Sequence, residues 1–291
     1  PVNLWYYPEY PERVDPTYSC TLESIDFMEK ETGIHYPWES YSQIPVADFI
    51  YGGMENTTAT VFGDINFADR RDSLDQNYLG TNIHELAHQW FGDYITGRSG
   101  RSAWLQESFA TFYTKLFQGS LFGDDHYEWM RRLEHTAALA ESDLNRLPIL
   151  HSQAGRARVY QKGSAVLDMM IYTFGADEYR RVVNHYLTRH AYSNVETNDL
   201  YQSFQDVLGL TPSWFFEEWI YRGGEPHYKV QYQDVTTGGA GSRRTEITIE
   251  QIHNTDDLVK LFTMPITVEV HYLDGTSDRT KVLIEKQTEK V

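Results

Sequence analysis

The sequence is short of basic residues, and this shortage excludes two classes of partner. It holds 25 lysines and arginines against 42 aspartates and glutamates, which leaves a net charge of −17 at pH 7. Nucleic-acid-binding proteins use basic surfaces to displace counterions from phosphates, and anionic membranes attract basic segments. We therefore expect neither a nucleic-acid partner nor binding to anionic lipid.

Cysteine and long apolar runs are also scarce. The single cysteine, Cys20, cannot form an internal disulfide, so the fold does not depend on an oxidising compartment. No run of about 18 apolar residues is present, and we expect no membrane-spanning helix. The sequence starts at Pro1 without a signal peptide, so we expect a fragment or a processed form and leave its compartment open.

The sequence does contain enough apolar side chains for a folded core. Hydrophobic residues make up 41% and aromatic residues 14% of its 291 residues, whereas disordered chains have low hydrophobicity. This length suits one large domain or two unequal ones. Residues 226–291 hold eight basic and ten acidic residues, so nearly all of the acidic surplus belongs to residues 1–225.

The pattern of apolar residues changes near residue 225. Before this point, helical spacing and capping signals predict helices at 15–33, 73–92, 102–118, 124–145, 160–174, 177–190, 197–208 and 212–221, and residues 44–67 look extended. After it, alternating β-branched runs predict strands near 227–232, 245–250, 266–272 and 281–284, with a hairpin-type loop at 236–242. We therefore predict two domains, 1–225 and 226–291, the second a small all-β module.

The strongest chemical signal is His84-Glu85-Leu86-Ala87-His88, which matches the pattern H-E-x-x-H. Because residues i and i+4 lie on one face of a helix, both imidazoles can bind one metal ion. Zinc is the natural occupant, since catalytic zinc sites use three nitrogen or oxygen ligands and leave a position for water. The pattern alone arises by chance in about one such chain in thirty, so it is not sufficient evidence by itself. A third ligand must also be found.

Glu107 is the candidate for the third ligand. It follows His88 after 18 intervening residues, on the next predicted helix, and a short turn between the helices can bring both to one ion. This spacing excludes two related patterns. The metzincin pattern needs Gly and His where Phe91 and Tyr94 stand, and thermolysin-like proteases place the glutamate one residue further on, at Ser108.

At this point the sequence resembles the aminopeptidase N-like zinc peptidases, a gluzincin family that includes the leukotriene hydrolase-type enzymes. Gly52-Gly53-Met54-Glu55-Asn56 is similar to the family's G-[AG]-M-E-N exopeptidase motif. Residues 84–93 resemble its zinc helix, and residues 160–163, Tyr-Gln-Lys-Gly, resemble the segment with its catalytic tyrosine. These motifs stand in the family's order over residues 50–165, and the similarity extends to about residue 225.

The resemblance implies a fold and a role in the catalytic site for five residues. The fold is α+β, with a thermolysin-like, mostly helical catalytic domain followed by a small β-sandwich-like domain. One Zn²⁺ per chain is held by His84, His88 and Glu107. Glu85, beside the metal rather than on it, acts as general base for the attacking water, and Tyr160 donates a hydrogen bond to the oxyanion.

The resemblance also assigns substrate binding to residues 52–56. Glu55 pairs with the free α-ammonium group of a peptide, which explains why such enzymes remove one terminal residue. Gly52 and Gly53 let an extended substrate approach the backbone, and Met54 and Asn56 complete the segment.

Three residues depart from the family's usual ones. Gln106 and Ser108 stand where Asn and Gly flank the zinc glutamate, and Asp93 stands where Asn is common. Such neighbours can alter ligand orientation without removing ligation. The resemblance also implies a large β-rich domain before the catalytic domain, which adds a polar group at the substrate's amino end. We expect that domain to be missing from this sequence.

We predict a zinc-dependent aminopeptidase that acts on peptides with a free N-terminus. Two alternatives stay open. One is a leukotriene hydrolase-like enzyme that also opens an epoxide, an option weakly favoured by Gly53 in place of Ala. The other is a non-catalytic peptide-binding relative. Such relatives usually lose a zinc ligand or the base, and this sequence keeps all four residues.

Overall fold

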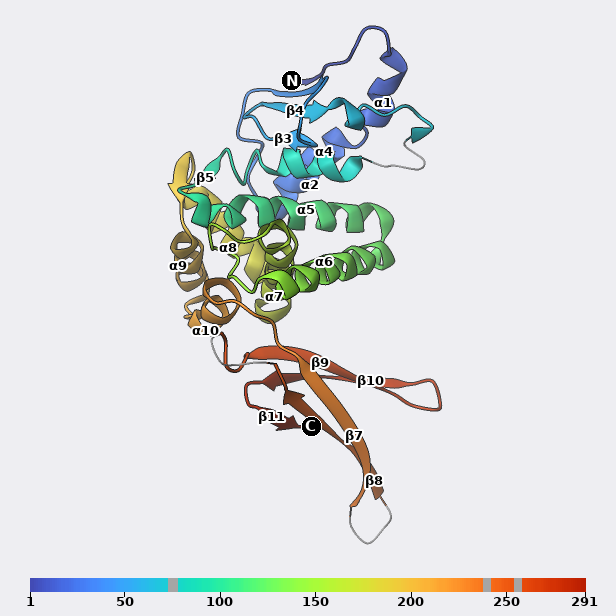
Figure 1. The fold of residues 1–291 in the computed structure, drawn as a ribbon, viewed down its shortest axis with the longest axis vertical. Coiled ribbons are helices and arrows are strands. Elements are labelled where there is room, and N and C mark those ends of the chain that lie inside the picture. Colours follow the sequence, from blue (N-terminus) through green and yellow to red (C-terminus); the bar gives the residue numbers. More distant parts are fainter. Residues whose placement is uncertain (73–77, 238–241, 254–257) are drawn as a thin grey trace. The chain divides into compact units, whose positions relative to one another are not determined.

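The computed structural model describes residues 1–72, 78–237, 242–253 and 258–291 (Figure 1). Helices and small sheets are both present, which confirms the predicted α+β class.

The chain divides into two compact units. Unit 1 comprises Pro1–Glu141 and Ile149–Thr211, and unit 2 comprises Ser142–Pro148 and Pro212–Val291. The sequence suggests a domain boundary near residue 225, and that boundary stays a prediction.

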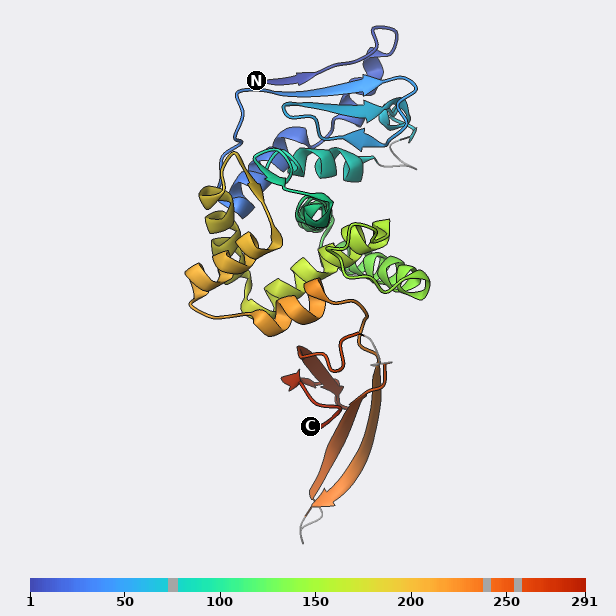
Figure 2. The same cartoon turned by 60° about the vertical axis from the view of Figure 1, so that its left-hand side comes forward.

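Unit 1 begins with a four-stranded sheet in the order β1-β2-β4-β3. Strand β2 pairs in parallel with both β1 and β4, whereas β3 runs antiparallel to β4. In both ribbon views the helices α2 and α4 lie along one side of this sheet (Figure 1 and Figure 2). The bounds are β1 Val2–Leu4, β2 Tyr41–Val46, β3 Gly53–Met54 and β4 Ala59–Gly63, followed by the 3-10 turn η2 Asp64–Asn66.

The helix predicted at 15–33 is broken in the structure, so that prediction was wrong at its start. The segment consists of the 3-10 turn η1 Pro11–Arg13, α1 Val14–Thr17 and α2 Thr21–Thr32. Cys20 has a φ of 64°, a left-handed conformation that a right-handed helix cannot contain. The predicted end is confirmed, because Gly33 closes α2 at a φ of 68°.

Helix α4 Leu79–Ala87 packs against α5 Trp104–Phe122, and aromatic side chains of α5 contact the residues that follow α4. Phe91 stacks on Phe109 at 4.5 Å between ring centroids and on Tyr113 at 5.2 Å. Helix α4 ends before the predicted stop at Gly92, and the chain turns there through β5 Ile95–Gly97 and η3 Gly100–Ser102. The predicted start at Ser73 lies outside the described residues.

The helices after α5 follow the predicted ranges, with one change of type. Residues 158–162 form a π-helix rather than the start of a regular α-helix. The bounds are α6 Asp124–Leu144, η4 Arg158–Lys162, α7 Gly163–Phe174, α8 Ala176–Arg189, β6 Ser193–Val195, which pairs with β5, and α9 Thr197–Leu208. Across the described ranges, no helix combines the length and apolar character needed to cross a membrane.

Unit 2 carries the predicted strands after a short helical start. All four strands are present, and a fifth was not predicted. The bounds are α10 Ser213–Phe216, the π-helix η5 Glu217–Tyr221, β7 Tyr228–Thr237, β8 Ser242–Gln251, β9 Met264–His271, β10 Ser277–Ile284 and β11 Thr288–Lys290. They form the sheets β11-β8-β7 and β10-β9, with every pair antiparallel. The loop predicted at 236–242 lies partly outside the described residues.

Candidate metal centre and its cavity

Three donor atoms from two helices converge in unit 1. His84 lies in the last turn of α4, His88 caps the end of that helix, and Glu107 lies in the first turn of α5. The two imidazole Nε2 atoms are 3.2 Å apart, and Glu107 Oε2 lies 3.2 Å from His84 Nε2 and 3.3 Å from His88 Nε2. The structure thus brings together the three residues that the spacing singled out as ligands.

A triangle of this size fits a zinc ion. Zinc binds nitrogen and oxygen ligands at about 2.0–2.1 Å, and tetrahedral ligands at that radius lie about 3.3 Å from one another. Two imidazole nitrogens and a carboxylate oxygen also match a catalytic zinc site, which keeps a fourth position for water. The donor atoms and their spacing therefore fit the metal that the resemblance implies.

Hydrogen bonds prepare two of these ligands. His88 Nδ1 lies 2.8 Å from the carbonyl oxygen of Phe91, so it donates its proton to that carbonyl and leaves the Nε2 lone pair for a metal. Burial alone would raise the pKa of Glu107, but its close contacts with the two imidazoles hold it well below its usual range. Glu107 is therefore an anion, as a metal ligand must be.

Glu85 lies beside the triad, on the same helix. Its side chain is buried, and carboxylate oxygens of Glu55 and Glu85 lie within 4.8 Å of each other and of a His88 nitrogen. Burial raises the pKa of Glu85 to about 8, with His88 opposing the rise and Glu55 adding to it. A cation in the triad would also oppose it, because positive charge favours the carboxylate form. A carboxyl group in this setting can take up a proton and return it near neutral pH.

The Gly52–Asn56 segment includes strand β3, Gly53–Met54, which passes close to Glu85. A Cβ atom at Gly53 would lie 2.4 Å from Glu85 Oε1, so the lack of a side chain lets β3 approach this carboxylate. Asn66 Nδ2 donates to the Gly52 carbonyl at 2.6 Å, and the Gly63 amide donates to it at 3.1 Å. These bonds fix the backbone that leads to Glu55.

Tyr160 reaches the site from the π-helix η4. Its ring lies parallel to that of His84, with 5.7 Å between centroids and 13° between planes. Burial raises the pKa of the Tyr160 phenol, and the nearby Glu107 carboxylate raises it further, so the phenol stays a proton donor. The Arg156 guanidinium lies 5.0 Å from the centre of the same ring.

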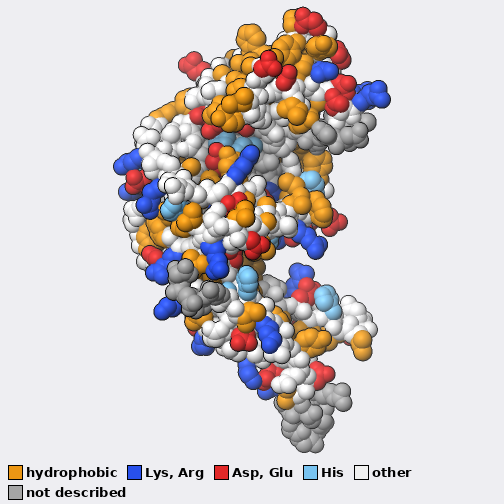
Figure 3. Space-filling model, viewed as in Figure 1, with side chains coloured by type: hydrophobic (Ala, Val, Ile, Leu, Met, Phe, Trp, Pro, Cys, Tyr) orange, Lys and Arg blue, Asp and Glu red, His pale blue; other side chains and the backbone are white. Residues whose placement is uncertain are grey.

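These side chains line one cavity of about 680 Å³ in unit 1. Figure 3 shows histidine and acidic side chains gathered in a hollow of this face. Ligand pockets commonly have volumes of about 300–1,000 Å³. The lining includes Gly52, Gly53, Met54, Glu55, His84, Glu85, His88, Glu107, Thr111, Lys115, Glu134, Arg156 and Tyr160, whereas Asn56 is not part of it.

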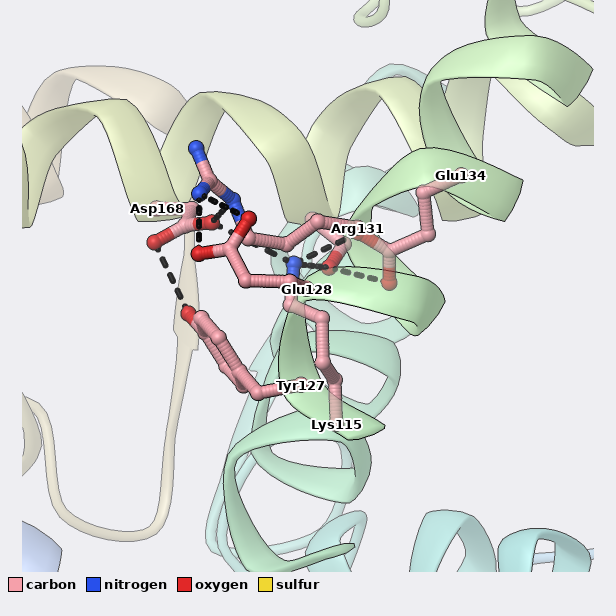
Figure 4. Close-up of polar contacts among 7 residues, drawn as sticks. Lys115, Tyr127, Glu128, Arg131, Glu134 and Asp168 are labelled. Carbon is pink, nitrogen blue, oxygen red and sulfur yellow. Dashed lines mark hydrogen bonds and ion pairs between the residues drawn. The ribbon is translucent and has the colours of Figure 1, made fainter. Parts of the chain in front are cut away.

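A buried network of charges continues from the cavity wall (Figure 4). Lys115 Nζ lies 2.6 Å from Glu134 Oε2 and 3.6 Å from Asp168 Oδ2, and its side chain is 1% exposed. Ser164 donates to Glu134 at 2.9 Å, and Arg131 Nε lies 2.8 Å from Asp168. Burial raises the pKa of Glu134, while Lys115 opposes the rise. Sequence patterns gave no sign of this network, since its members come from three helices.

Gln89 is a second feature that the sequence did not reveal. Its side chain is fully buried, and its Oε1 accepts bonds from the Thr58 amide at 2.8 Å and the Tyr36 hydroxyl at 3.3 Å. Its Nε2 donates to the Glu55 carbonyl at 3.4 Å. Gln89 therefore connects the end of α4 to the segment that carries Glu55.

Two of the departures from the family pattern bond to backbone groups of other segments. Gln106 Oε1 accepts a bond from the Gly97 amide at 2.9 Å. Ser108 Oγ donates to the Val159 carbonyl at 2.6 Å. Both side chains thus join α5 to neighbouring segments.

Two histidines and a glutamate at one point, with a second glutamate beside them in a cavity, define the class of mononuclear metallopeptidases of the H-E-x-x-H type. The chain belongs to peptidase family M1, because the model of the Peptidase family M1 domain matches residues 17–219. The resemblance drawn from the motifs is thereby confirmed.

The chain is also similar to individual members. It is 32% identical over 271 residues to Tricorn protease-interacting factor F2 of Thermoplasma volcanium and 31% identical over 281 residues to leucyl aminopeptidase of Saccharolobus solfataricus. These matches cover 89% and 88% of this chain but 31% and 34% of the relatives, so the chain spans about a third of their length.

A solved structure shares the fold. The aminopeptidase A of Legionella pneumophila, determined in complex with aspartic acid, superposes with a TM-score of 0.79 at 16% identity, over 100% of this chain and 33% of that one.

Proposed function

We propose that this chain is the catalytic part of a zinc-dependent aminopeptidase that removes N-terminal residues from peptides. The convergence of His84, His88 and Glu107 at 3.2–3.3 Å carries the proposal, with Glu85 beside them. The aminopeptidase names of the relatives support it. Zinc held by these three residues would lower the pKa of a bound water and polarise the scissile carbonyl.

The chain's own residues supply the remaining steps. Glu85 takes a proton from the attacking water and passes it to the leaving amine, a task that its buried position and raised pKa support. Tyr160 donates from its phenol to the carbonyl oxygen as negative charge develops there. Removing such a donor typically costs about 10²–10³ in rate.

Glu55 sets the exopeptidase register in this mechanism. Its carboxylate lies close to Glu85 and His88, where it can pair with a free α-ammonium group. The Gly52–Gly53 backbone can lie along the substrate. The resemblance to the family implies a β-rich domain before the catalytic domain that adds a polar group at this amine, and we propose the same contribution in this protein.

Replacement of Glu85 by Gln tests the proposal. We expect one zinc per chain in both forms and a loss of about 10³-fold or more in the hydrolysis of aminoacyl-nitroanilides by the variant. Full activity in the variant would contradict the mechanism. Cleavage of N-acetylated peptides as fast as free ones would instead indicate an endopeptidase, and turnover of an epoxide substrate would indicate the bifunctional alternative.

A further inference from the structure

The buried hydroxyl of Ser108 joins the two segments that carry Glu107 and Tyr160. Ser108 directly follows Glu107 in α5 and has no exposed surface. Its Oγ donates to the carbonyl oxygen of Val159, which directly precedes Tyr160, at 2.6 Å. A single side-chain bond therefore connects the backbone beside a proposed ligand to the backbone beside the proposed oxyanion donor.

The π geometry of η4 explains why this carbonyl accepts a side-chain donor. In a regular α-helix the Gly163 amide would bond to the Val159 carbonyl. Here that amide bonds to the carbonyls of Arg158 and Tyr160 instead. The Ser108 hydroxyl supplies a hydrogen-bond donor to the Val159 carbonyl from another helix.

Gly163 makes this close approach possible. A Cβ atom at residue 163 would lie 1.8 Å from Ser108 Oγ and 2.6 Å from its Cβ. The Ser108 side chain thus occupies the space between α5 and the turn after Tyr160. The glycine that the family usually has at position 108 has no side chain, so it could neither fill that space nor donate this hydrogen bond.

We propose that Ser108 is a positioning residue that holds Tyr160 in place beside the metal centre. This rests on the proposed function, because Tyr160 acts within that mechanism. The Tyr160 ring lies beside that of His84, with 5.7 Å between centroids. Because Val159 directly precedes Tyr160, a shift of Val159 would carry the phenol away from the reacting carbonyl. A misplacement of about 1 Å can cost about 10²-fold in rate.

Removal of the hydroxyl tests the role of this bond. In the zinc-loaded protein, Ser108→Ala and Ser108→Gly should each lower kcat about tenfold or more, with little change in KM or in bound zinc. Ser203→Ala is the matched control, because Ser203 is also fully buried and donates to a helix carbonyl, that of Asp199, at 3.0 Å. Its kcat should equal that of the unmodified protein.

A double-mutant cycle with Tyr160→Phe decides whether Ser108 acts through Tyr160. The Ser108→Ala change should lower kcat when Tyr160 is present and have no further effect in Tyr160→Phe. An equal fall in both backgrounds overturns the inference, and so does a loss of bound zinc, since the hydroxyl would then serve packing or Glu107. Ser108→Gly replaces Ser108→Ala in the cycle if the latter does not fold. The proposed function fails on a different result, full activity in Glu85→Gln.

Discussion

At the scale of single residues, hydrogen bonds to the backbone set the direction of side chains around the triad. His88 donates to the Phe91 carbonyl, and Gln106 accepts from the Gly97 amide. Such bonds restrict a side chain to one orientation and, for an imidazole, to one tautomer. Replacement of one side chain here therefore acts on geometry as well as on charge.

Glu55 is the residue whose negative charge should matter most for binding the substrate amine. In Glu55→Gln, the amide can still accept a hydrogen bond from the substrate amine but no longer offers a negative charge. A charge-assisted bond contributes about 1.5–3 kcal/mol, so we expect kcat/KM to fall about 10–100-fold, mainly through KM. Steady-state kinetics with free and N-acetylated peptides measure this fall in kcat/KM. The ratio of kcat/KM for free peptides to that for N-acetylated peptides should decrease. Glu39→Gln, at an exposed glutamate, should change neither kcat/KM nor the preference for free peptides. An unaltered preference in Glu55→Gln would contradict the pairing of Glu55 with the substrate amine.

Lys115 is the residue whose loss should be most costly to stability. Lys115→Met leaves Glu134 buried without its cation, and breaking a buried pair in this way costs about 3–5 kcal/mol. Because burial already raises the pKa of Glu134, the folded variant should bind a proton more readily than the unfolded chain does. Its free energy of unfolding should therefore rise as the pH falls from the raised pKa of Glu134 toward the ordinary glutamate value of about 4.3. Urea unfolding at several pH values measures this dependence.

Two variants control for the effect of Lys115→Met. Glu128 forms an exposed pair with Arg131 on the same helix, and Glu128→Gln should cost no more than about 1 kcal/mol. The double variant Lys115→Met with Glu134→Leu removes both charges and should recover most of the loss. A double variant as unstable as Lys115→Met alone would show that packing, rather than the unpaired carboxyl, sets the cost.

At the scale of elements, the site depends on how α4 is joined to the strands and to α5. Gln89, just past the end of α4, bonds to the carbonyl oxygen of Glu55 and to the amide of Thr58. Ser108 and Gln106 join α5 to η4 and β5. The relative placement of Glu55, Glu107 and Tyr160 thus depends on side chains outside the proposed catalytic and substrate-binding set.

Gln89→Ala tests the first of these connections. The change leaves the Thr58 amide and the Glu55 carbonyl without this partner, so the Glu55 segment should move more than the triad. We expect KM to rise about tenfold with a smaller change in kcat, since one lost buried hydrogen bond costs about 1–3 kcal/mol. Gln205→Ala, at a glutamine of α9 that bonds to Thr211, is the control. A fall in kcat at constant KM would contradict this assignment.

At the scale of the whole molecule, metal binding should stabilise the two units unequally. The described residues that could hold a metal ion together all belong to unit 1. An ion that binds only the folded state stabilises it by about 4 kcal/mol at a thousandfold excess over its dissociation constant. Chelation should therefore lower the unfolding temperature of unit 1 by several degrees.

Hydrogen exchange with and without a chelator locates this effect. Amides of α4 and α5 should lose protection, because an ion held by His84, His88 and Glu107 would link these two helices, whereas amides of β7 and β8 should keep theirs. Addition of zinc should restore the protection. Equal loss in both regions, or none in either, would contradict a structural contribution of the metal confined to unit 1.

The sequence by itself determined the helical spacing, the strand alternation and the candidate ligands, because each depends on residues close together or at a fixed separation. It predicted most helix ranges after residue 102 and four of the five strands of unit 2. It placed His84 and His88 on one predicted helix and Glu107 on the next.

Only the tertiary structure decided the features that depend on contacts between distant segments. The break at Cys20, the π-helix at Tyr160 and the bonds of Gln89 and Ser108 leave no periodic trace, since each depends on which backbone group lies opposite one side chain. The Lys115 network likewise depends on three helices meeting at one point. Local spacing selects residue types, whereas long-range packing selects their partners, and that division separates what the sequence predicted from what it did not.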